Sequence, residues 1–428
     1  MNYQSALRKV YEFQARGICM GLEQIRAALK LRGSPERGMA FVQIAGTNGK
    51  GSVASMMAAS LSAAGYRTGL FTSPHLHRYV ERIRIDGRPL GETEAARRIE
   101  DLISVFGAPQ SPRLSFFELA TLLAVETFRD KKCDIAILEV GLGGRLDSTT
   151  AVPSILSIVT AIALDHTELL GESTYLIARE KAGIVRRGVP LVVGRCDLSA
   201  KRAIAARARA MHAPTIWLDR DFKLLSRPAA GRFDVRVENA MYRNLKLGLS
   251  GDHQLENAAC ALAGLHKLKQ KGYDLPEAAI RRALARIRWP GRLEYIAQKP
   301  GLLLDTAHNP DGCRALAAYL EKQVKTEAKR VLIFGAMSDK NYPEMLRILA
   351  PRFNRVFFAQ PKIERAATYE QLSAVCAGTP TKSLQSAIKR ARRAAGANGL
   401  VVITGSIFLV AEARAVVLGV RSDPLIRM

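Results

Sequence analysis

The sequence predicts an α/β protein with two domains, each built on a largely parallel sheet covered by helices. Short β-rich runs alternate with amphipathic helical stretches, a pattern typical of parallel strands joined by right-handed crossovers. The chain of 428 residues exceeds the size at which a single core usually stops growing. A break at Trp289-Pro290-Gly291 separates two such blocks, so we predict domains over residues 1–290 and 291–428.

The expected elements follow in chain order. The larger block begins with a strand over 41–45, a helix over 53–64 that ends before Gly65, and a strand over 68–71. Its later strands are expected over 134–140, 155–160 and 190–193. The smaller block repeats the pattern, with strands expected over 302–305, 331–334, 355–358 and 400–404.

Composition narrows the class of protein. The net charge of +25 favours anionic ligands such as nucleotides, polyglutamates or nucleic acids. The basic clusters at 201–209, 281–288 and 389–393 are spaced with Ala or Leu in helical rhythm, which indicates solvated helix faces and argues against nucleic-acid binding. The six cysteines form no CxxC pair, so we expect reduced thiols. No membrane span or signal peptide is expected, which favours the cytoplasm.

A glycine-rich loop carries the clearest chemistry. Residues 46–52 read Gly-Thr-Asn-Gly-Lys-Gly-Ser between an apolar strand and a helix. Glycines let the backbone turn its N–H groups inward, the helix start favours an anion, and Lys50 supplies a positive charge. The spacing departs from GxxxxGK[ST], and the plain alternative is a glycine turn with a solvated lysine. We predict a nucleotide phosphate site.

Polar residues follow several of the predicted strands. Glu139 ends one strand, His166 follows another and Ser73 follows a third. Open α/β sheets bind ligands at these carboxyl ends, and Mg²⁺ needs few protein ligands beside phosphate and water, so the three residues are metal candidates. Each is a weak signal alone. Lys181 is expected on a helix, where periodicity favours a plain salt bridge or a solvated lysine.

The second block offers a matching set. Asp305 and His308 lie where a strand gives way to a helix, and both could face a ligand at that crevice. Arg292 lies at the expected hinge, from which a cation reaches a phosphate only when the domains close. Closure would keep water from a phosphorylated intermediate.

Taken in order, these segments resemble the folylpolyglutamate synthase and dihydrofolate synthase family of the Mur ligase superfamily. AGTNGKGS alone indicates only the superfamily, whereas FTSPHLHRYVERIRIDG (71–87) and LEVGLGGRLDSTT (138–150) indicate the folate branch. The remaining matches are GLEQI (21–25), FFELAT (116–121), LDHTELLG (164–171), IAREKAGI (177–184), GDHQLENAA (251–259), WPGRLE (289–294), DTAHNPDG (305–312), GAMSDKN (335–341) and GSIFLVAEAR (405–414).

The resemblance implies a parallel-sheet P-loop nucleotide-binding domain followed by a smaller Rossmann-like α/β domain. It implies an ATP-dependent ligase that phosphorylates a folate or dihydropteroate carboxylate and couples it to L-glutamate. It also implies Mg²⁺, with two ions expected, a carbamylated Lys181 and a monomer with neither nucleic-acid nor membrane partners.

The resemblance assigns roles by position. Lys50, Lys181 and His308 would be catalytic, and Ser73, Glu139 and His166 would hold the metal. The nucleotide would be bound by Gly46, Thr47, Asn48, Gly49, Lys50, Gly51, Ser52, Asn257, Arg292 and Asp305. The acceptor and glutamate would lie near Phe117, Glu118, Asp147 and Ser406.

Two departures and three rivals stay open at this stage. Thr150 stands where the family often has Asn, and Thr306 where it often has Gly, which puts substrate contacts in question. The rivals are another Mur-type ligase acting on a cell-wall or peptide substrate, a nucleic-acid-binding P-loop protein, and a non-catalytic nucleotide-binding module.

Overall fold

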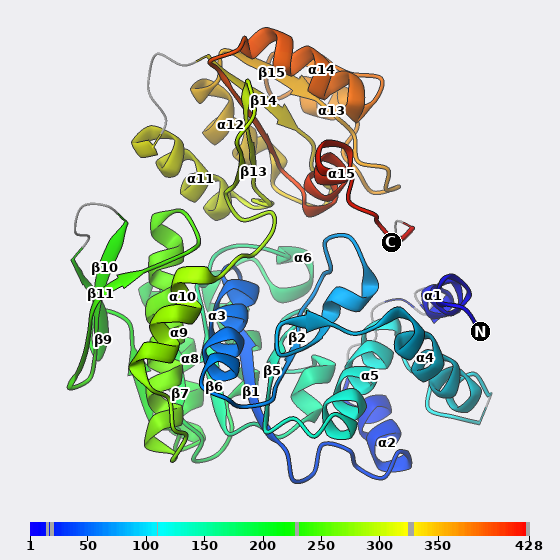
Figure 1. Ribbon diagram of the computed structural model, residues 1–428, viewed down its shortest axis with the longest axis vertical. Coiled ribbons are helices and arrows are strands. Elements are labelled where there is room, and N and C mark those ends of the chain that lie inside the picture. The colour runs from blue at the N-terminus through cyan, green and yellow to red at the C-terminus, as the bar shows by residue number, and fades with distance from the viewer. Residues whose placement is uncertain (14–16, 18–20, 109, 227–230, 324–328, 425–428) are drawn as a thin grey trace.

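The computed structural model describes residues 1–428 except 14–16, 18–20, 109, 227–230, 324–328 and 425–428 (Figure 1). A large α/β part occupies the lower half of Figure 1, and a smaller one lies above it. The predicted boundary between residues 290 and 291 falls between α10 (Glu277–Arg286) and β12 (Glu294–Ile296). The division into two domains stays a prediction, because a domain is a part of the chain that can fold independently.

The large part is built on an eight-stranded sheet with the order β4-β3-β2-β5-β1-β6-β7-β8. Six central strands are parallel, and β3 and β4 add an antiparallel edge beyond β2. The strands are β1 (Ala40–Ala45), β2 (Thr68–Phe71), β3 (Ile83–Ile85), β4 (Arg88–Pro89), β5 (Ile135–Glu139), β6 (Leu156–Val159), β7 (Leu191–Val193) and β8 (Thr215–Trp217). The parallel strands predicted for this block are confirmed.

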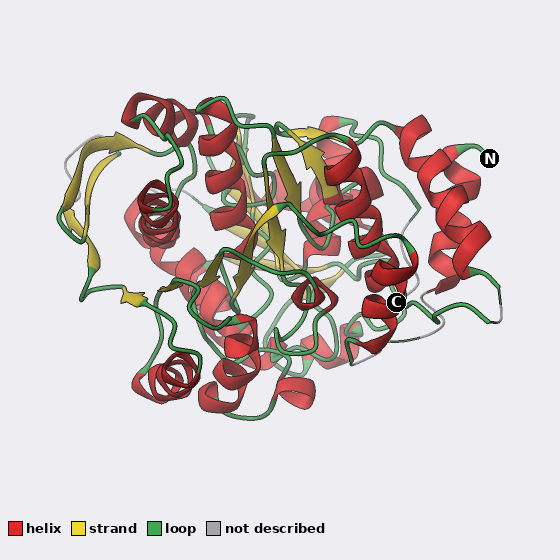
Figure 2. Cartoon of the chain, turned by 90° about the horizontal axis from the view of Figure 1, so that it is seen from below, coloured by secondary structure: helices red, strands yellow, loops and turns green. Residues whose placement is uncertain are grey.

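Helices cover both faces of this sheet, because its strands are apolar along their whole length (Figure 2). One core packs α3 (Lys50–Ala63), α9 (Asp252–Gln270) and α10 against the sheet. A second core holds α1 (Tyr3–Glu12), α2 (Glu23–Leu31), α4 (Glu92–Phe106) and α5 (Phe116–Asp130). The β6–β7 side carries α6 (Thr167–Leu170), α7 (Thr174–Lys181) and α8 (Leu198–Ala210).

A small antiparallel sheet was not expected from the sequence. It has the order β11-β10-β9 and comprises β9 (Phe222–Ser226), β10 (Arg232–Val237) and β11 (Ala240–Lys246). Its inward side chains, among them Phe233 and Val235, join the core around α9. Figure 2 shows this sheet projecting to one side of the molecule.

The smaller part has a six-stranded sheet in the order β12-β13-β17-β14-β15-β16, parallel except for β12. Its other strands are β13 (Gly301–Leu304), β14 (Arg330–Phe334), β15 (Arg355–Phe358), β16 (Thr379–Pro380) and β17 (Leu400–Thr404). One face packs α11 (Pro310–Gln323), α12 (Tyr342–Leu349) and α13 (Tyr369–Ser373); the other packs α14 (Leu384–Ala395) and α15 (Ile407–Leu418). The strands predicted here are confirmed.

Several composition-based expectations can be placed on this fold. The basic clusters at 201–209 and 389–393 lie on α8 and α14. Five cysteines are free thiols, and Cys19 lies outside the described residues. Among the helices that the structure describes, none is long and apolar enough to span a lipid bilayer.

Candidate active site

The glycine-rich loop joins β1 to α3, as predicted, and the helix begins at Lys50 rather than Val53. Gly46 has φ +150° and Gly49 has φ +88°, values that side-chain-bearing residues rarely adopt. A Cβ on Gly49 would collide with Oδ1 of Asn257 from α9. The loop therefore needs glycine both for its backbone turn and for its close approach to α9.

Lys50 lies across this loop. Its Nζ donates to the carbonyl oxygens of Gly46 at 3.0 Å and Thr47 at 3.2 Å. Burial lowers the pKa of Lys50, and the carboxylates of Glu139 and Asp165 oppose that shift. The lysine is therefore partly exposed and hydrogen-bonded to the loop rather than simply solvated, and its role at a phosphate site stays a prediction.

Glu139 and Ser73 meet beside the loop. Glu139 ends β5 and is buried, and its Oε2 accepts a hydrogen bond of 3.0 Å from the backbone N–H of Ser73. A Cβ on Gly51 would lie 3.4 Å from Glu139 Oε2 and 3.5 Å from Oε1, so the carboxylate borders the first turn of α3. Burial raises the pKa of Glu139, while Lys50 and the Ser73 N–H oppose the rise.

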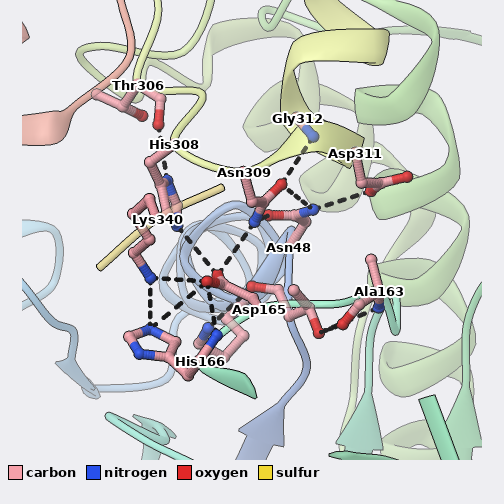
Figure 3. A network of polar contacts seen from close by, with 12 residues as sticks. Asn48, Ala163, Asp165, His166, Thr306, His308, Asn309, Asp311, Gly312 and Lys340 are labelled. Atoms are coloured by element: carbon pink, nitrogen blue, oxygen red, sulfur yellow. Dashed lines mark hydrogen bonds and ion pairs between the residues drawn. The ribbon is translucent and has the colours of Figure 1, made fainter. Parts of the chain in front are cut away.

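A polar network joins the two parts of the molecule around Asp165 (Figure 3). Lys340 Nζ contacts Asp165 Oδ1 at 2.7 Å and His166 Nε2 at 3.1 Å. His308 Nε2 lies 3.6 Å from Asp165 Oδ2, and Asn309 Nδ2 donates to the same oxygen at 3.1 Å. Burial alone would raise the pKa of Asp165, but His308 and Lys340 hold it well below its usual range.

The imidazole of His166 is neutral in this setting. Burial lowers its pKa to about 4, with Lys340 and His308 adding to the shift against the opposing charge of Asp165. His166 has φ +50°, a left-handed conformation that turns the chain toward the second part of the molecule. Neutral imidazole nitrogen is the form that binds metals.

The donor atoms fit a hard cation that also binds phosphate. Glu139 supplies a carboxylate, Ser73 a hydroxyl and His166 an imidazole that already has a cation, Lys340 Nζ, as its neighbour. The structure joins Ser73 to Glu139 but gives neither a contact with His166. Among the described residues, no three His, Cys, Asp or Glu side chains are grouped to hold an ion by themselves. Mg²⁺ usually completes its shell with phosphate oxygens and water, so the small donor set suits it.

Lys181 is buried, although its sequence pattern favoured a solvated lysine. It is the last residue of α7, as the helix prediction required, and only 6% of its surface is exposed. Burial, together with the charge of Lys50, lowers its pKa to about 7 from 10.5. The solvated interpretation is wrong, and the lowered pKa makes a substantial share of the amine neutral near pH 7.

The other nucleotide-site candidates are Asn257 on α9 and, around the hinge, Asp305 and Arg292. Asn257 faces Gly49 and donates from Nδ2 to Gln254 Oε1 at 3.1 Å. Asp305 accepts the backbone N–H groups of Leu293 at 2.9 Å and Ala307 at 3.0 Å. Its carboxylate therefore fixes the hinge backbone. Arg292 contributes to the electrostatic surroundings of both Lys50 and Glu139.

The four residues predicted to lie near the substrates all contact neighbouring residues of the protein. Asp147 accepts the N–H groups of Gly141 at 2.9 Å and Leu142 at 3.0 Å and so shapes the loop after β5. Glu118 forms a capping box with Ser115 at the start of α5. Phe117 stacks near Phe71 at 5.7 Å and closes over Gly141. Ser406 caps α15.

Thr150 and Thr306, the two residues that differ from the family pattern, both form side-chain hydrogen bonds. Thr150 Oγ1 accepts from Gln43 Nε2 at 2.6 Å and donates to Gly144 O at 2.7 Å. Thr306 Oγ1 accepts a hydrogen bond from Arg292 Nη1. In this chain, the hydroxyl of Thr306 thus fixes the guanidinium of the hinge arginine.

A cavity of about 220 Å³ lies between the two parts. The segment after β2, the hinge and α15 all line it, and Glu139 and Gly51 border it. Its basic side chains include Arg84, Arg292 and Arg414. This composition suits an anionic ligand.

Sequence reasoning missed three residues of the network: Asp165, Asn309 and Lys340. Each lies inside a segment that carries the family resemblance, at 164–171, 305–312 and 335–341. No local pattern links a carboxylate after β6 to a lysine 175 positions later. Only the packing of the two sheets brings them together.

Comparisons with known proteins agree with this geometry. Residues 44–265 match the Mur ligase middle domain, and residues 291–407 match the Mur ligase glutamate ligase domain. The chain is 33% identical to folylpolyglutamate synthase of Lacticaseibacillus casei, over 99% of this chain and 100% of that protein.

Two solved structures are similar over nearly the whole chain. Escherichia coli FolC in complex with DHPP and ADP superimposes with a TM-score of 0.90 at 32% identity, covering 99% of each chain. The bifunctional folylpolyglutamate synthase/dihydrofolate synthase of Yersinia pestis, complexed with AMPPNP and Mn ion, gives 0.88 at 32% identity and 98% of each chain. With a phosphate loop facing a second α/β domain and likeness along its entire length, this chain belongs to the folylpolyglutamate synthase and dihydrofolate synthase family of ATP-dependent Mur ligases.

Proposed function

We propose that the chain joins the amino group of L-glutamate to the carboxylate of a dihydropteroate or folate acceptor through an acyl phosphate. The observation that carries this proposal is the meeting of Lys50 and the phosphate loop with Lys340 and His308 of the second domain around Asp165. A triphosphate between them would have cations on both sides of its terminal phosphoryl group.

Two displacements give a balanced reaction. An acceptor carboxylate oxygen attacks the γ-phosphorus of ATP, the bond to the bridging oxygen breaks, and ADP leaves. The glutamate nitrogen then attacks the acyl carbon, the C–O bond to phosphate breaks, and inorganic phosphate leaves while the nitrogen loses a proton. Positioning and charge neutralisation supply most of the rate enhancement in phosphoryl transfer.

Individual residues take the following roles in this proposal. Lys50 and the N–H groups of residues 46–52 hold the phosphates, with Asn257, Arg292 and Asp305 on the cleft side. His308 stands near the γ-phosphate, because its ring faces Asp165 across the domain boundary. Phe117, Glu118 and Asp147 shape the acceptor site after β5, and Ser406 stands near the incoming glutamate through its place at the start of α15.

Ser73, Glu139 and His166 would hold Mg²⁺, and their separation into a Ser73–Glu139 pair and a lone His166 supports two ions. When bound, Mg²⁺ neutralises phosphate charge. The chain's own part is to orient the three metal ligands. The Ser73 N–H fixes the Glu139 carboxylate, and Asp165 holds Lys340 beside His166.

A carbamate on Lys181 is part of the proposal. A neutral amine adds CO₂ and releases a proton, and the pKa of Lys181, lowered to about 7, makes a substantial share of that amine neutral near pH 7. The product is an anion that has the cations Lys50 and Lys340 near it, beside the carboxylates of Asp147 and Asp165. The positive charge of the two lysines supports the modification.

The relatives favour the acceptor class. The Escherichia coli structure holds DHPP and ADP, and one similar structure holds Mn, AMPPNP and L-glutamate. We propose the same ligand classes here, with a monomer in the cytoplasm as the working form and residues 1–290 and 291–428 as its domains.

Product analysis tests the proposal. Purified protein with ATP, Mg²⁺ and glutamate is given dihydropteroate and tetrahydrofolate in separate reactions, and amide products are identified by mass spectrometry. We expect ADP and a glutamyl amide with at least one acceptor. Turnover with a nucleotide-linked muropeptide instead would favour the cell-wall alternative.

Two site variants sharpen this experiment. Lys50→Ala and Glu139→Ala should each lower turnover by about a hundredfold or more while thermal unfolding stays cooperative, because the first removes the cation that holds the phosphates and the second removes a ligand of Mg²⁺. Lys201→Ala, on the solvent-facing side of α8, is the matched control and should retain full activity. Near-normal turnover by either site variant would contradict the assigned roles.

A further inference from the structure

The end of the chain crosses back to the first domain. Asp423 lies between α1 and the segment after β2, and only 5% of its surface is exposed. Its Oδ2 accepts hydrogen bonds from Tyr3 Oη at 2.7 Å and from the backbone N–H of Tyr79 at 2.8 Å. Its own N–H donates to His77 O at 2.8 Å. Figure 1 shows both chain ends on the same side of the molecule.

His77 forms hydrogen bonds with a residue of α15 in the second domain and with a residue of the segment that follows α15. Arg414 Nη1 contacts His77 Nε2 at 3.0 Å, and Ser422 Oγ lies 2.8 Å from His77 Nδ1. A guanidinium can only donate, so Nε2 accepts and Nδ1 carries the proton that is donated to Ser422. Both ring nitrogens of a neutral imidazole are thereby satisfied.

The same contacts continue to the hinge. Arg414 Nε donates to Glu294 Oε1 and Oε2 at 3.0 Å each, and Glu294 Oε2 accepts the Gly291 N–H at 2.8 Å. Gly291 lies in the break between the domains. A continuous polar chain therefore runs from the hinge through α15 to His77 and the tail.

Hydrogen bonds to Glu81 tie together the backbone within residues 73–82. The Glu81 carboxylate accepts hydrogen bonds from the backbone N–H groups of Leu76 at 3.0 Å, His77 at 3.2 Å and Arg78 at 3.0 Å, which forms a compact turn. The segment starts at Ser73, whose N–H fixes Glu139, and it lines the cavity between the domains together with Arg414 and Val420.

The two oxygens of the buried Asp423 carboxylate are used unequally. Oδ2 accepts two hydrogen bonds, whereas Oδ1 is buried with no hydrogen-bond partner among the described residues. Burying an incompletely paired polar group costs free energy, but an apolar side chain here would leave the Tyr3 hydroxyl and the Tyr79 N–H without an acceptor. The charge has a use if it holds the Tyr79 N–H, and with it the 73–82 segment, in one position.

We propose that Asp423 and His77 are positioning residues that latch the 73–82 segment to the second domain and so set the cavity wall that faces the acceptor carboxylate. This latch rests on the proposed function, because it assigns the cavity to the acceptor. Lys50 and the phosphate loop lie on β1 and α3, outside the latch contacts. Ser73, Gly51 and Arg292 border the same cavity, but the latch contacts are made at His77 and Tyr79. The latch therefore affects acceptor binding more strongly than ATP binding.

Asp423→Ala tests the latch in the full-length protein, with Arg421→Ala as its matched control. Arg421 lies in the same tail but makes only an exposed 3.8 Å ion pair with Glu92. Hydrogen exchange of peptides covering 73–82 is measured without ligands, and KM values for acceptor and ATP are measured in parallel. Hydrogen bonds to a charged group shift equilibria by roughly tenfold or more.

For Asp423→Ala we expect exchange in 73–82 to become about tenfold faster, KM for the acceptor to rise about tenfold, and KM for ATP to stay within about twofold. Asp423→Asn keeps one acceptor oxygen and should give intermediate values; Arg421→Ala should match the parent protein. If Asp423→Ala does not fold, Tyr3→Phe removes one bond to the same carboxylate and should shift both quantities in the same directions.

The outcomes separate the two proposals. Unchanged exchange in 73–82 overturns the latch, and faster exchange with an unchanged KM for the acceptor overturns its positioning role. An equal rise in both KM values also overturns it, since the effect would then not be confined to the acceptor. If the parent protein makes no amide, the proposed function fails, while the exchange measurement still decides whether the latch exists.

Discussion

At the scale of single residues, the site works by holding charges where water is scarce. Burial lowers the pKa of Lys181 to about 7, whereas Asp165 is ionised in spite of burial because His308 and Lys340 surround it. Glu139 sits between these extremes, with Lys50 opposing the effect of burial. The same low-dielectric setting thus gives each group a different protonation state according to its neighbours.

Lys181 gives a prediction about pH and stability. Its folded-state pKa is lowered to about 7 from 10.5, so the unmodified folded protein binds a proton less readily than the unfolded chain. Its contribution to stability is therefore fully present above pH 10.5 and is lost as the pH falls toward 7. In CO₂-free buffer, Lys181→Met should remove this dependence and raise the free energy of unfolding at pH 7 by a few kcal/mol.

Denaturant titrations of both proteins between pH 7 and 10 measure this effect. The difference between Lys181→Met and the parent protein should shrink as the pH rises. A difference that is independent of pH would show that Lys181 keeps an ordinary pKa. For activity, Lys181→Ala should lose ligation, and a short carboxylate such as acetate should restore part of it if a carbamate is the working form.

At the scale of elements, the junction of β1 and α3 carries the most demanding geometry. The loop reverses direction through two glycines with positive φ and packs against α9, which leaves the first N–H groups of α3 facing the phosphate site. Some glycines are required only because the backbone has a positive φ. Gly49 is required for a second reason, because Asn257 leaves no space for a Cβ.

Gly49→Ala should therefore weaken ATP binding by at least about a hundredfold, since the added methyl collides with Asn257 and the loop must move. Gly65→Ala is a matched control: Gly65 has φ +100°, yet open space surrounds the position of its Cβ. It should destabilise folding by about 1 kcal/mol and leave ATP affinity unchanged. Calorimetric titration with a non-hydrolysable nucleotide measures both, and equal losses in the two variants would contradict the argument.

Sequence patterns predicted the elements that bury apolar runs and missed those that do not. The parallel strands at the centre of both sheets are short and mostly apolar, rich in Ile, Val, Leu and Phe, which is typical of strands buried on both faces. The antiparallel strands β9–β11 alternate buried and charged residues, as in Arg232–Val237, and their pairing depends on contacts with α9. The strand ends and the glycine loop likewise suggested Lys50, Glu139 and His166 as site residues, which stays a prediction, whereas the burial of Lys181 depends on tertiary packing.

At the scale of the whole molecule, the proposed site combines groups from the two parts of the chain. Asn48 of the phosphate loop donates to Asn309 at 3.2 Å and to Asp311 at 2.9 Å, and Lys340 reaches back to Asp165 and His166. The net charge of +25 surrounds this interface with a field that attracts anionic substrates. No contact within one domain alone could place cations on both sides of a phosphate.

Lys340→Met tests the buried part of this interface. The lysine and Asp165 are both more than 90% buried, so removing one partner leaves an incompletely paired charge and should destabilise the protein by about 2 kcal/mol or more. Lys322→Met is the control, because its ion pair with Asp252 also spans α11 and α9 but is exposed, and it should cost less than about 1 kcal/mol. Thermal unfolding compares the two; equal losses would argue against a buried pair at Asp165.

Oxygen transfer tests the proposed chemistry most directly. The acceptor is prepared with ¹⁸O in its reacting carboxylate, and the inorganic phosphate released with ADP is analysed by mass spectrometry. An acyl phosphate requires one carboxylate oxygen to leave with the phosphoryl group, so each turnover should place one ¹⁸O atom in phosphate. Amide formation with unlabelled phosphate would contradict the account.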